Sequence, residues 1–344
     1  MELISRLHEN VPLAPLTTLK VGGPARYFLR AESEDDVIAG FDFAARNVLS
    51  VFVLGGGSNL VVSDKGFDGL VIQIALKGID NHESIISAAA GEDWDPFVEY
   101  CVNRELAGVE CLSGIPGTVG GTPVQNVGAY GQEVSETIVK VRCYDRGTGD
   151  ILDLSNEECG FKYRMSIFNT SERERFVVLG VTYRLDSNGA PKLAYKDLID
   201  AFGDSRPTVR QVRERVLAIR RTKSMVIDQN DPNSRSAGSF FKNPIISTEE
   251  FLKIKEKFGA AVPHFPAGDG SVKIPSAWLI ERSGFNKGFI AGNAGISKNH
   301  TLAIINRGGA TAAEIISLKN MIQNGVFEKF AIRLVPEPVF VGQF

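Results

Sequence analysis

Apolar residues follow two spacings along the chain, and each spacing predicts a different kind of element. A repeat of three to four residues, as in Val37, Ile38 and Phe41, indicates helices with one buried face. The predicted helices cover residues 31–47, 95–106, 208–221, 248–258, 276–283 and 311–324. Short apolar or alternating runs predict strands at 51–54, 60–62, 70–74, 84–90, 138–144, 175–185, 302–306 and 331–335. This mixture predicts an α+β fold.

Three of the predicted helices carry signals at their first residues. Ser33 and Thr208 are suited to cap the helices that follow them, because their hydroxyls can accept from backbone N–H groups. Pro96 is tolerated at the first helical position, so the second helix is predicted to open there. In the helix 208–221, the arginines are interpreted as mostly a solvated face; they occupy positions 210, 213, 215, 220 and 221.

Residues 113–133 break both spacings. They contain six glycines and two prolines but no Lys or Arg. Glycine and proline destabilise helix interiors by roughly 1 and 3 kcal/mol, while Ile115, Val119 and Tyr130 supply apolar area for packing. We therefore expect an ordered loop whose backbone N–H groups approach a ligand closely. A glycine-rich turn without a ligand is the alternative.

A second glycine cluster, residues 55–57 followed by Ser58 and Asn59, lies between two predicted strands. Consecutive backbone N–H groups in such a turn form an anion-binding concavity, which suits a diphosphate. The cluster has neither the Gly-Lys-Ser/Thr of a Walker loop nor a Rossmann fingerprint leading into a helix. A nucleotide site of another kind is therefore predicted.

Composition narrows the classes of protein further. The 344 residues, 43% of them hydrophobic, allow two or three domains. A net charge of −3 argues against nucleic-acid binding. No apolar run approaches the ~20 residues that span a bilayer and no basic-then-apolar signal is present, so we expect a cytoplasmic protein without membrane contact. The cysteines are interpreted as reduced, mostly buried thiols, and no metal site is predicted, since the histidines are far apart.

Three short clusters contain side chains suited to catalysis. Arg164 follows Phe161-Lys162-Tyr163, Ser239 lies among small residues before two phenylalanines, and Glu337 lies between two prolines. Singly, each has a structural explanation: a surface ion pair, a turn hydroxyl and a solvated carboxylate. The prolines restrict the backbone at Glu337, which favours a fixed role for it.

In combination, these motifs resemble one family. Gly-Gly-Gly-Ser-Asn at 55–59, Ile-Pro-Gly-x-Val-Gly-Gly-x-Pro-x-Gln-Asn-x-Gly-Ala-Tyr-Gly at 115–131, Tyr-Arg at 163–164, Gly-Ser-Phe-Phe-Lys-Asn-Pro at 238–244 and Glu337 occur in this order. With Tyr195-x-Asp-Leu, they resemble the UDP-N-acetylenolpyruvoylglucosamine reductases (MurB), in the form with an extra tyrosine-bearing substrate loop. The resemblance covers almost the whole chain.

The resemblance implies an FAD-binding fold of the vanillyl-alcohol-oxidase (PCMH) type in two subdomains, 1–70 and 71–222. A C-terminal α+β substrate-binding domain would follow at 223–330, and 331–344 would form a strand returning to the active site. NADPH would reduce FAD, and the flavin would pass hydride to C3 of the enolpyruvyl group of UDP-N-acetylglucosamine enolpyruvate. A monomer is the default expectation.

The resemblance also implies roles for individual residues. Arg164 would stabilise charge beside the substrate carboxylate, Ser239 would protonate C2, and Glu337 would be a third catalytic residue. Cofactor binding is implied for Gly55, Gly56, Gly57, Ser58, Asn59, Ile115, Pro116, Gly117, Gly120, Gly121, Gln125, Asn126, Gly128, Ala129, Tyr130, Gly131 and Arg220. Substrate binding is implied for Tyr163, Tyr195, Lys223, Asn243 and His300. After Lys223 the family commonly continues Leu-Pro, whereas this chain has Ser224-Met225, so the hinge expected at 224–236 departs from the pattern.

Two other functions fit parts of this pattern. A flavin-dependent alcohol oxidase could use the same fold, although relatives of that kind often bind flavin covalently through His or Cys, and neither glycine loop contains one. A nucleotide-binding scaffold without catalysis is the other, but Arg164, Ser239 and Glu337 together argue against it.

Overall fold

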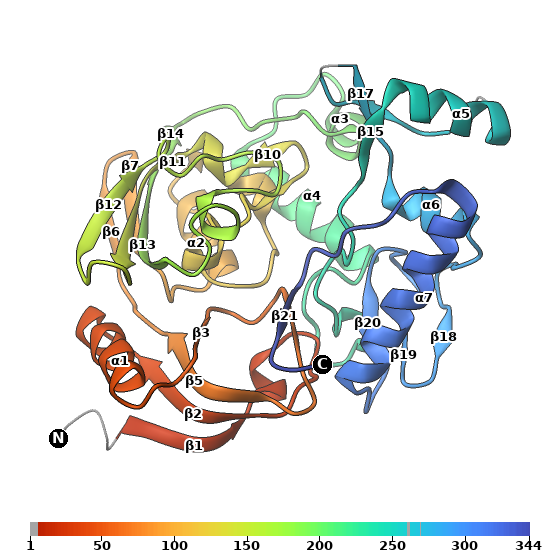
Figure 1. Ribbon diagram of the computed structural model, residues 1–344. Coiled ribbons are helices and arrows are strands. Elements are labelled where there is room, and N and C mark those ends of the chain that lie inside the picture. Colours follow the sequence, from red (N-terminus) through yellow and green to blue (C-terminus); the bar gives the residue numbers. More distant parts are fainter. Residues whose placement is uncertain (1–5, 260–261, 269) are drawn as a thin grey trace. The chain divides into compact units, whose positions relative to one another are not determined.

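The computed structural model describes residues 6–259, 262–268 and 270–344, which form two compact units (Figure 1). Unit 1 comprises the N-terminal residues up to Val11, Pro24–Gly57 and Phe67–Val226; unit 2 comprises Pro12–Gly23, Ser58–Gly66 and Ile227–Phe344. The sequence predicts a boundary at 222/223 and assigns 12–23 and 58–66 to the first subdomain. The division of unit 1 near residue 70 remains a prediction.

The first sheet of unit 1 has the strand order β1-β2-β5-β3. Its strands are β1 (Leu7–Pro12), β2 (Pro24–Ala31), β3 (Val51–Leu54) and β5 (Phe67–Ile74), and both β2 and β3 run parallel to β5. Helix α1 (Glu34–Arg46) contacts β2 and β5 and buries Val37 and Ala44. Ser33 accepts from Asp36 N–H and Asp36 accepts from Ser33 N–H, which confirms the predicted cap as a capping box.

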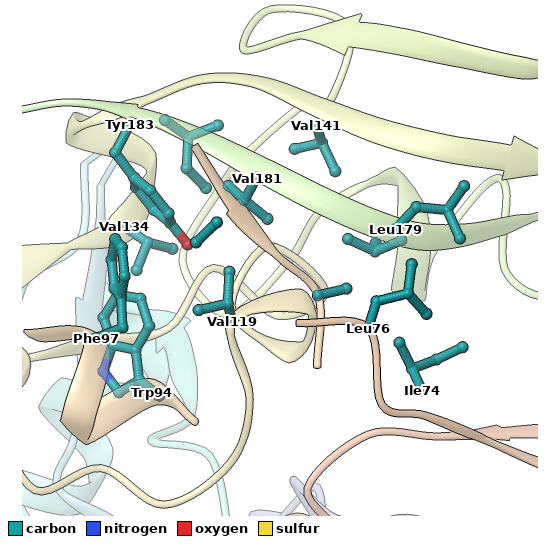
Figure 2. Packing of buried hydrophobic residues seen from close by; sticks show 14 of the residues in the cluster. Ile74, Leu76, Trp94, Phe97, Val119, Val134, Val141, Leu179, Val181 and Tyr183 are labelled. Carbon is teal, nitrogen blue, oxygen red and sulfur yellow. The ribbon is translucent and has the colours of Figure 1, made fainter. Parts of the chain in front are cut away.

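The second sheet of unit 1 is antiparallel, with the order β12-β11-β13-β7-β6. Its strands are β6 (Ile79–His82), β7 (Ile85–Ala89), β11 (Ile138–Asp145), β12 (Ile151–Ser155) and β13 (Phe176–Arg184). Figure 2 shows Tyr183 and Val181 of β13 packed towards Phe97, Trp94 and Val119, residues that the structure buries. The glycine-rich segment therefore lies directly on the core of this sheet.

Helix α2 (Trp94–Val102) differs from the prediction at both ends. Trp94 is fully buried in the core and Asp93 is extended, so the helix begins two residues before Pro96. Glu105 has a left-handed backbone, which stops the helix before Leu106. Leu106 instead belongs to β8 (Leu106–Ala107), which pairs with β14 (Asp186–Ser187).

Helices α3 (Lys196–Phe202) and α4 (Val209–Thr222) complete unit 1 with the short pair β9 (Gly128–Ala129) and β10 (Gln132–Glu133). Thr208 and Gln211 form the capping box of α4, as predicted for Thr208. The expectation of a mostly solvated arginine face is wrong for Arg213 and Arg220, which are only 7% exposed. Their spacing of seven residues puts both on the face that also carries Val212 and Val216.

Unit 2 contains three small sheets: β15-β17-β16, β18-β19-β20 and β21-β4. Their strands are β4 (Leu60–Val62), β15 (Ile245–Ser247), β16 (Phe265–Pro266), β17 (Ser271–Lys273), β18 (Ile290–Ala291), β19 (Ala294–Ile296), β20 (Ile304–Asn306) and β21 (Val339–Val341). Helices α5 (Thr248–Phe258), α6 (Ser276–Arg282) and α7 (Ala312–Phe330) contribute to its core, which includes Phe240, Phe241 and Ile315.

The end of unit 2 corrects two predictions. Helix α7 continues six residues beyond the predicted end at 324, because Val326 and Phe330 extend its buried face. The predicted strand 331–335 is absent; Ala331 adopts the left-handed conformation that terminates α7. The last strand is β21, which runs parallel to β4.

The described residues also include six 3-10 helices and no helix that is both long and apolar enough to cross a membrane. The 3-10 helices are η2 (Ala14–Leu16), η3 (Glu110–Leu112), η4 (Val119–Gly121), η5 (Val134–Glu136), η6 (Ile167–Asn169) and η7 (Pro232–Ser234).

Candidate functional site: two glycine loops and the polar groups around them

The two glycine loops meet within unit 1. A Cβ atom added to Gly56 would lie 2.6 Å from Gly117 Cα and 3.1 Å from the backbone nitrogen of Thr118. A Cβ on Gly55 would lie 3.1 Å from the Thr118 hydroxyl oxygen. Only residues without side chains allow backbones to approach so closely. The loops at 55–57 and 113–133, far apart in sequence, therefore form one surface.

Hydrogen bonds to the core of unit 1 fix the conformation of the second loop. Trp94 N–H donates to Gly117 O at 3.0 Å, and Gly120 N–H donates to Ala90 O at 2.9 Å. The Thr122 hydroxyl donates to Val119 O at 2.8 Å and lies 3.0 Å from the Tyr183 hydroxyl in the core. Buried polar groups satisfied in this way give a loop one conformation. The loop is thus ordered, as its apolar residues predicted.

Several backbone groups of this surface are available to a ligand. Among the described residues, no acceptor is found for the N–H groups of Gly56 and Gly57. A Cβ on Gly121 would meet nothing closer than the Thr118 hydroxyl oxygen at 4.0 Å, so the space beside Gly121 is open. Unpaired adjacent N–H groups are the features that bind phosphate oxygens. The glycine loops therefore fit the diphosphate of FAD.

Arg220 supplies a buried donor that the described protein groups leave unused. Its Nη2 donates to Met225 O at 2.8 Å, whereas its Nε is buried and has no hydrogen-bond partner. Burial is also the largest influence on its pKa, which is lowered. A Cβ on Gly114, at the start of the second loop, would lie 3.3 Å from this Nε. A polar ligand atom here would satisfy the orphaned donor, so Arg220 fits its expected role at the flavin.

Asp95 and Arg213 anchor the start of the same loop, and sequence reasoning missed both. Asp95 Oδ1 accepts from Gly114 N–H at 2.6 Å and from Arg213 Nη1 at 2.5 Å, while Asp95 Oδ2 accepts from Arg213 Nη2 at 3.1 Å. This bidentate pair ties α2, α4 and the loop together. In the sequence, Asp95 and Arg213 cannot be distinguished from charged residues on the exposed faces of helices.

Arg164 lies in a tight turn beside the end of the second loop. Lys162 and Met165 exchange two backbone hydrogen bonds, at 2.9 and 3.0 Å, and Arg164 has a left-handed backbone with φ of 55°. Its Nη2 donates to Gly128 O at 2.5 Å and its Nη1 to Asn126 O at 3.3 Å. A left-handed arginine costs energy and persists only where surrounding contacts fix it. Arg164, Asn126 and Gly128, all predicted site residues, are thus in contact.

A group of aromatic and charged side chains joins the other end of the loop to α3 and α4. The rings of Tyr130 and Tyr195 meet edge to face at 5.3 Å between centroids, and Lys223 Nζ lies 5.9 Å from the Tyr130 ring. Lys223 also pairs with Asp197 at 3.2 Å. Burial raises the pKa of Tyr130, while the nearby Arg220 lowers it less strongly. Tyr130, predicted to bind the cofactor, therefore lies beside Tyr195 and Lys223, predicted to bind the substrate.

In unit 2, Ser239 and Glu337 lie on adjoining extended segments. Glu337 N–H donates to Phe240 O at 2.9 Å, and Lys242 N–H donates to Val335 O at 3.0 Å. Phe240 and Phe241 are buried and hold this pairing against the core. Among the described residues, no partner is found for the Ser239 hydroxyl, which is half-buried. The structure thus brings these two predicted catalytic residues together.

Asn59 is part of the same arrangement. Its Nδ2 donates to Glu337 O at 3.3 Å, and its backbone carbonyl accepts from Val339 N–H at 2.9 Å. The Thr18 hydroxyl links Ser58 O and Ser236 O in the same unit. Ser58 and Asn59, predicted to hold the cofactor, therefore support the backbone around Ser239 and Glu337. Any contact they make with FAD stays a prediction.

Asn243 and His300 each have a local structural role in unit 2. Asn243 Oδ1 accepts from Ser276 N–H at 2.9 Å in the first turn of α6, and His300 Nδ1 accepts from Leu302 N–H at 3.0 Å. Their contacts with substrate stay predictions. The same is true of the other predicted residues in unit 1, which lie along the second loop or beside Arg164: Ile115, Pro116, Gln125, Ala129, Gly131 and Tyr163.

The cysteines add no reactive group to the site. All four are free and buried: Cys101, Cys111, Cys143 and Cys159. Burial raises the pKa of Cys101 and of Cys159 to about 12, so neither forms a thiolate near neutral pH. In the described ranges, no group of three or more His, Cys, Asp or Glu side chains could hold a metal ion.

Comparisons with known proteins agree with this arrangement. Residues 230–341 match the family described as "UDP-N-acetylenolpyruvoylglucosamine reductase, C-terminal domain". Residues 25–155 match the family described as "FAD binding domain". The UDP-N-acetylenolpyruvoylglucosamine reductase of Thermobifida fusca is 47% identical over 97% of both chains. That of Streptomyces coelicolor is 47% identical over 99% of this chain and 92% of its own.

The solved structures that resemble the chain include one that covers nearly all of it. The UDP-N-acetylenolpyruvylglucosamine reductase (MurB) from Thermus caldophilus has a TM-score of 0.68 and 25% identity, covering 97% of this chain and 98% of that one. Together with the family matches, this confirms the predicted fold class: an α+β chain with an FAD-binding fold and a C-terminal reductase domain.

Proposed function

Because the chain belongs to the UDP-N-acetylenolpyruvoylglucosamine reductase family, we propose that it makes UDP-N-acetylmuramate for peptidoglycan precursor synthesis. Its substrate is UDP-N-acetylglucosamine enolpyruvate, its cofactor is FAD and its reductant is NADPH. The observation that carries the proposal is 47% identity over nearly the whole length of both chains, combined with two glycine loops that meet in unit 1.

The residues of unit 1 bind the cofactor in this proposal. The glycine loops surround the FAD diphosphate and ribityl chain with backbone N–H groups, and Arg220 Nε donates to a polar atom of the flavin. When bound, FAD accepts hydride from NADPH and supplies it to C3 of the enolpyruvyl group. The open space at Gly121 and the orphaned Nε of Arg220 support this assignment.

Arg164 stabilises the charge that hydride addition creates. Addition at C3 places negative charge at C2, and this charge spreads into the neighbouring carboxylate. A guanidinium held in place beforehand lowers that barrier without reorganising during the reaction. The left-handed turn and the carbonyls of Asn126 and Gly128 support such a fixed role, because they orient Arg164 before substrate binds.

Ser239 delivers the proton to C2. A hydroxyl is a poor acid in water, so this role requires a protected site and a close approach to C2. The half-buried Ser239 hydroxyl fits the role, since no described protein group occupies it. Glu337, on the adjoining segment, orients the reacting group or passes a proton on.

Substrate recognition is assigned to five residues. Tyr195 covers the bound sugar nucleotide, and Lys223 binds its diphosphate. Asn243 contributes near the diphosphate and uridine through its amide NH₂, since its oxygen is already engaged by Ser276. Tyr163 and His300 complete the set as further polar contacts.

The alternative of a flavin-dependent alcohol oxidase has less support. The full-length relatives are reductases, and neither glycine loop carries a His or Cys for covalent flavin attachment. We further propose that the enzyme is a monomer in the cytoplasm and has no nucleic-acid or membrane partner. Four free, buried cysteines are consistent with a reducing compartment.

Isotope labelling tests the proposed reaction. Turnover in D₂O with NADPH that carries deuterium at the transferred position is expected to give UDP-N-acetylmuramate with deuterium at C3, because the hydrogen held by the reduced cofactor can exchange with solvent and both sources then carry the label. Turnover in D₂O is expected to place deuterium at C2. Consumption of NADPH without a labelled product, or dependence on an alcohol and O₂ instead of the enolpyruvyl substrate, would contradict the proposal.

A further inference from the structure

We propose that Asp197 is a positioning residue that holds Lys223 and Tyr195 in the positions in which they bind the sugar nucleotide. The inference rests on the proposed function, because it concerns two of the residues assigned to substrate binding. Asp197 has no role in that assignment. It lies two residues after Tyr195 and its carboxylate reaches Lys223, so it connects the two elements that carry them.

On one side of this connection is the end of α4. Lys223 directly follows α4, which fixes its backbone but leaves a four-carbon side chain with many rotamers. Asp197 Oδ2 lies 3.2 Å from Lys223 Nζ and holds the ammonium 5.9 Å from the Tyr130 ring. An ammonium has three donors, so one bond to Asp197 leaves two for anionic oxygens of a ligand.

On the other side is the start of α3. This helix has seven residues, and Tyr195 at its N-cap makes no side-chain cap hydrogen bond. Helices this short depend on contacts with the rest of the protein. Leu198 is fully buried against α4 and anchors the middle of α3, while Asp197 is the acidic residue of its first turn. The ion pair thus tethers the exposed beginning of α3, where Tyr195 meets Tyr130.

The Asp197–Lys223 pair is accessible to solvent, so its effect on substrate binding can be measured apart from any effect on the stability of the fold. The side chains of Lys223 and Asp197 are 36% and 39% exposed, and ion pairs in such places contribute little to folding. Loss of the Asp197 charge should therefore leave the fold and the flavin site intact. It should release both the Lys223 ammonium and the first turn of α3, and so weaken substrate binding.

The test compares Asp197→Asn with Asp200→Asn in the FAD-loaded full chain. Asp200 is an exposed residue of the same helix with no ion pair among the described contacts, so its change removes the same charge nearby. For Asp197→Asn we expect KM for UDP-N-acetylglucosamine enolpyruvate to rise about tenfold, which corresponds to about 1.4 kcal/mol. The kcat, the flavin content and the rate of flavin reduction by NADPH should stay within twofold of the unmodified protein. Asp197→Glu should recover part of the lost affinity.

Three results would overturn the inference: equal KM values for the two variants, a lower kcat at unchanged KM, or a lower KM for Asp197→Asn. The last would mean that Asp197 competes with the diphosphate for Lys223. A fourth result, a loss of thermal stability in Asp197→Asn, would assign the pair to folding. If the unmodified protein does not reduce the enolpyruvyl substrate, the proposed function is contradicted as well. If the unmodified protein is active and Asp197→Asn has the same KM, only this inference is contradicted.

Discussion

Arg164 shows how one residue can combine an unfavourable backbone with a defined task. Its left-handed φ of 55° is held by the two hydrogen bonds between Lys162 and Met165, and its guanidinium is held by two carbonyls of the glycine loop. Contacts on both sides offset the strain, which is of order 1–3 kcal/mol for such a residue. The guanidinium is therefore oriented before a ligand arrives.

Replacing Arg164 by Met should lower kcat about 10²–10³-fold, because a preorganised charge is lost from the transition state. Flavin content should be unchanged. Steady-state kinetics with saturating NADPH and enolpyruvyl substrate measure this effect. Arg173→Met, on an exposed arginine nine residues further on, is the matched control and should behave as the unmodified protein. A normal kcat for Arg164→Met would remove Arg164 from the catalytic set.

Ser239→Ala tests the proton donor separately from cofactor binding. The variant should still reduce its flavin with NADPH at the normal rate, because that step needs no proton at C2. Turnover of the enolpyruvyl substrate should fall by at least about 10²-fold. Rapid mixing measures the two half-reactions in turn. Equal loss of both would mean that Ser239 supports the structure of the site and is not its acid.

At the scale of elements, the second glycine loop contains two neighbouring glycines with different reasons for lacking a side chain. A Cβ on Gly120 would lie 2.5 Å from Ala90 Cβ in the core, whereas a Cβ on Gly121 would enter open space. Gly120 is therefore needed for packing against the core, whereas Gly121 is needed to leave space for the ligand, which we propose is FAD.

Gly120→Ala and Gly121→Ala should consequently fail in different ways. Gly120→Ala should lower the free energy of unfolding by about 1–3 kcal/mol through overpacking. Gly121→Ala should keep the stability of the FAD-free protein and weaken FAD binding at least tenfold. Thermal unfolding of the FAD-free protein and titration with FAD separate the two effects. Unchanged FAD affinity in Gly121→Ala would contradict the assignment of this surface to the cofactor.

The Asp95–Arg213 pair gives a second prediction for an element. Arg213→Met should destabilise the protein by about 2 kcal/mol, because Asp95 keeps a charge that is no longer compensated. Arg210→Met is the control, since Arg210 lies on the exposed face of α4 and its Nη2 reaches Asn103. Urea unfolding measures both. Similar midpoints for the two variants would show that the partly buried Asp95–Arg213 pair has no special role.

Sequence patterns predicted most elements but not how charges are distributed on them. Caps at Ser33 and Thr208 were correct because a cap is a local arrangement of a few residues. Burial of Arg213 and Arg220 could not be predicted, since it depends on Asp95 and on the loop at Gly114, both distant in sequence. The predicted end of α7 at 324 is too early, because Val326 and Phe330, four residues apart, extend its buried face. The meeting of the two glycine loops likewise required the tertiary structure.

At the scale of the molecule, the two units are interleaved along the sequence. Residues 12–23 and 58–66 leave the N-terminal half of the chain and pack in unit 2, where β4 pairs with β21 and Asp64 accepts from the first N–H groups of α7. The chain therefore passes between the units several times, whereas the sequence predicts contiguous domains with boundaries at 70/71, 222/223 and 330/331.

The proposed monomer is open to a direct check at this scale. Light scattering coupled to size-exclusion chromatography should give a mass near the 37.4 kDa of one chain, with or without enolpyruvyl substrate. A mass of twice that value would contradict the monomer while leaving the reaction unaffected.

The central claim is that the paired glycine loops hold FAD without a covalent bond and that this FAD carries electrons from NADPH to the enolpyruvyl sugar nucleotide. The absorbance spectrum of the purified protein, recorded without oxygen, tests it most directly. We expect flavin bands that bleach when NADPH is added and return when UDP-N-acetylglucosamine enolpyruvate follows, and we expect acid to release the flavin into solution. A colourless protein that takes up no added FAD would contradict the claim.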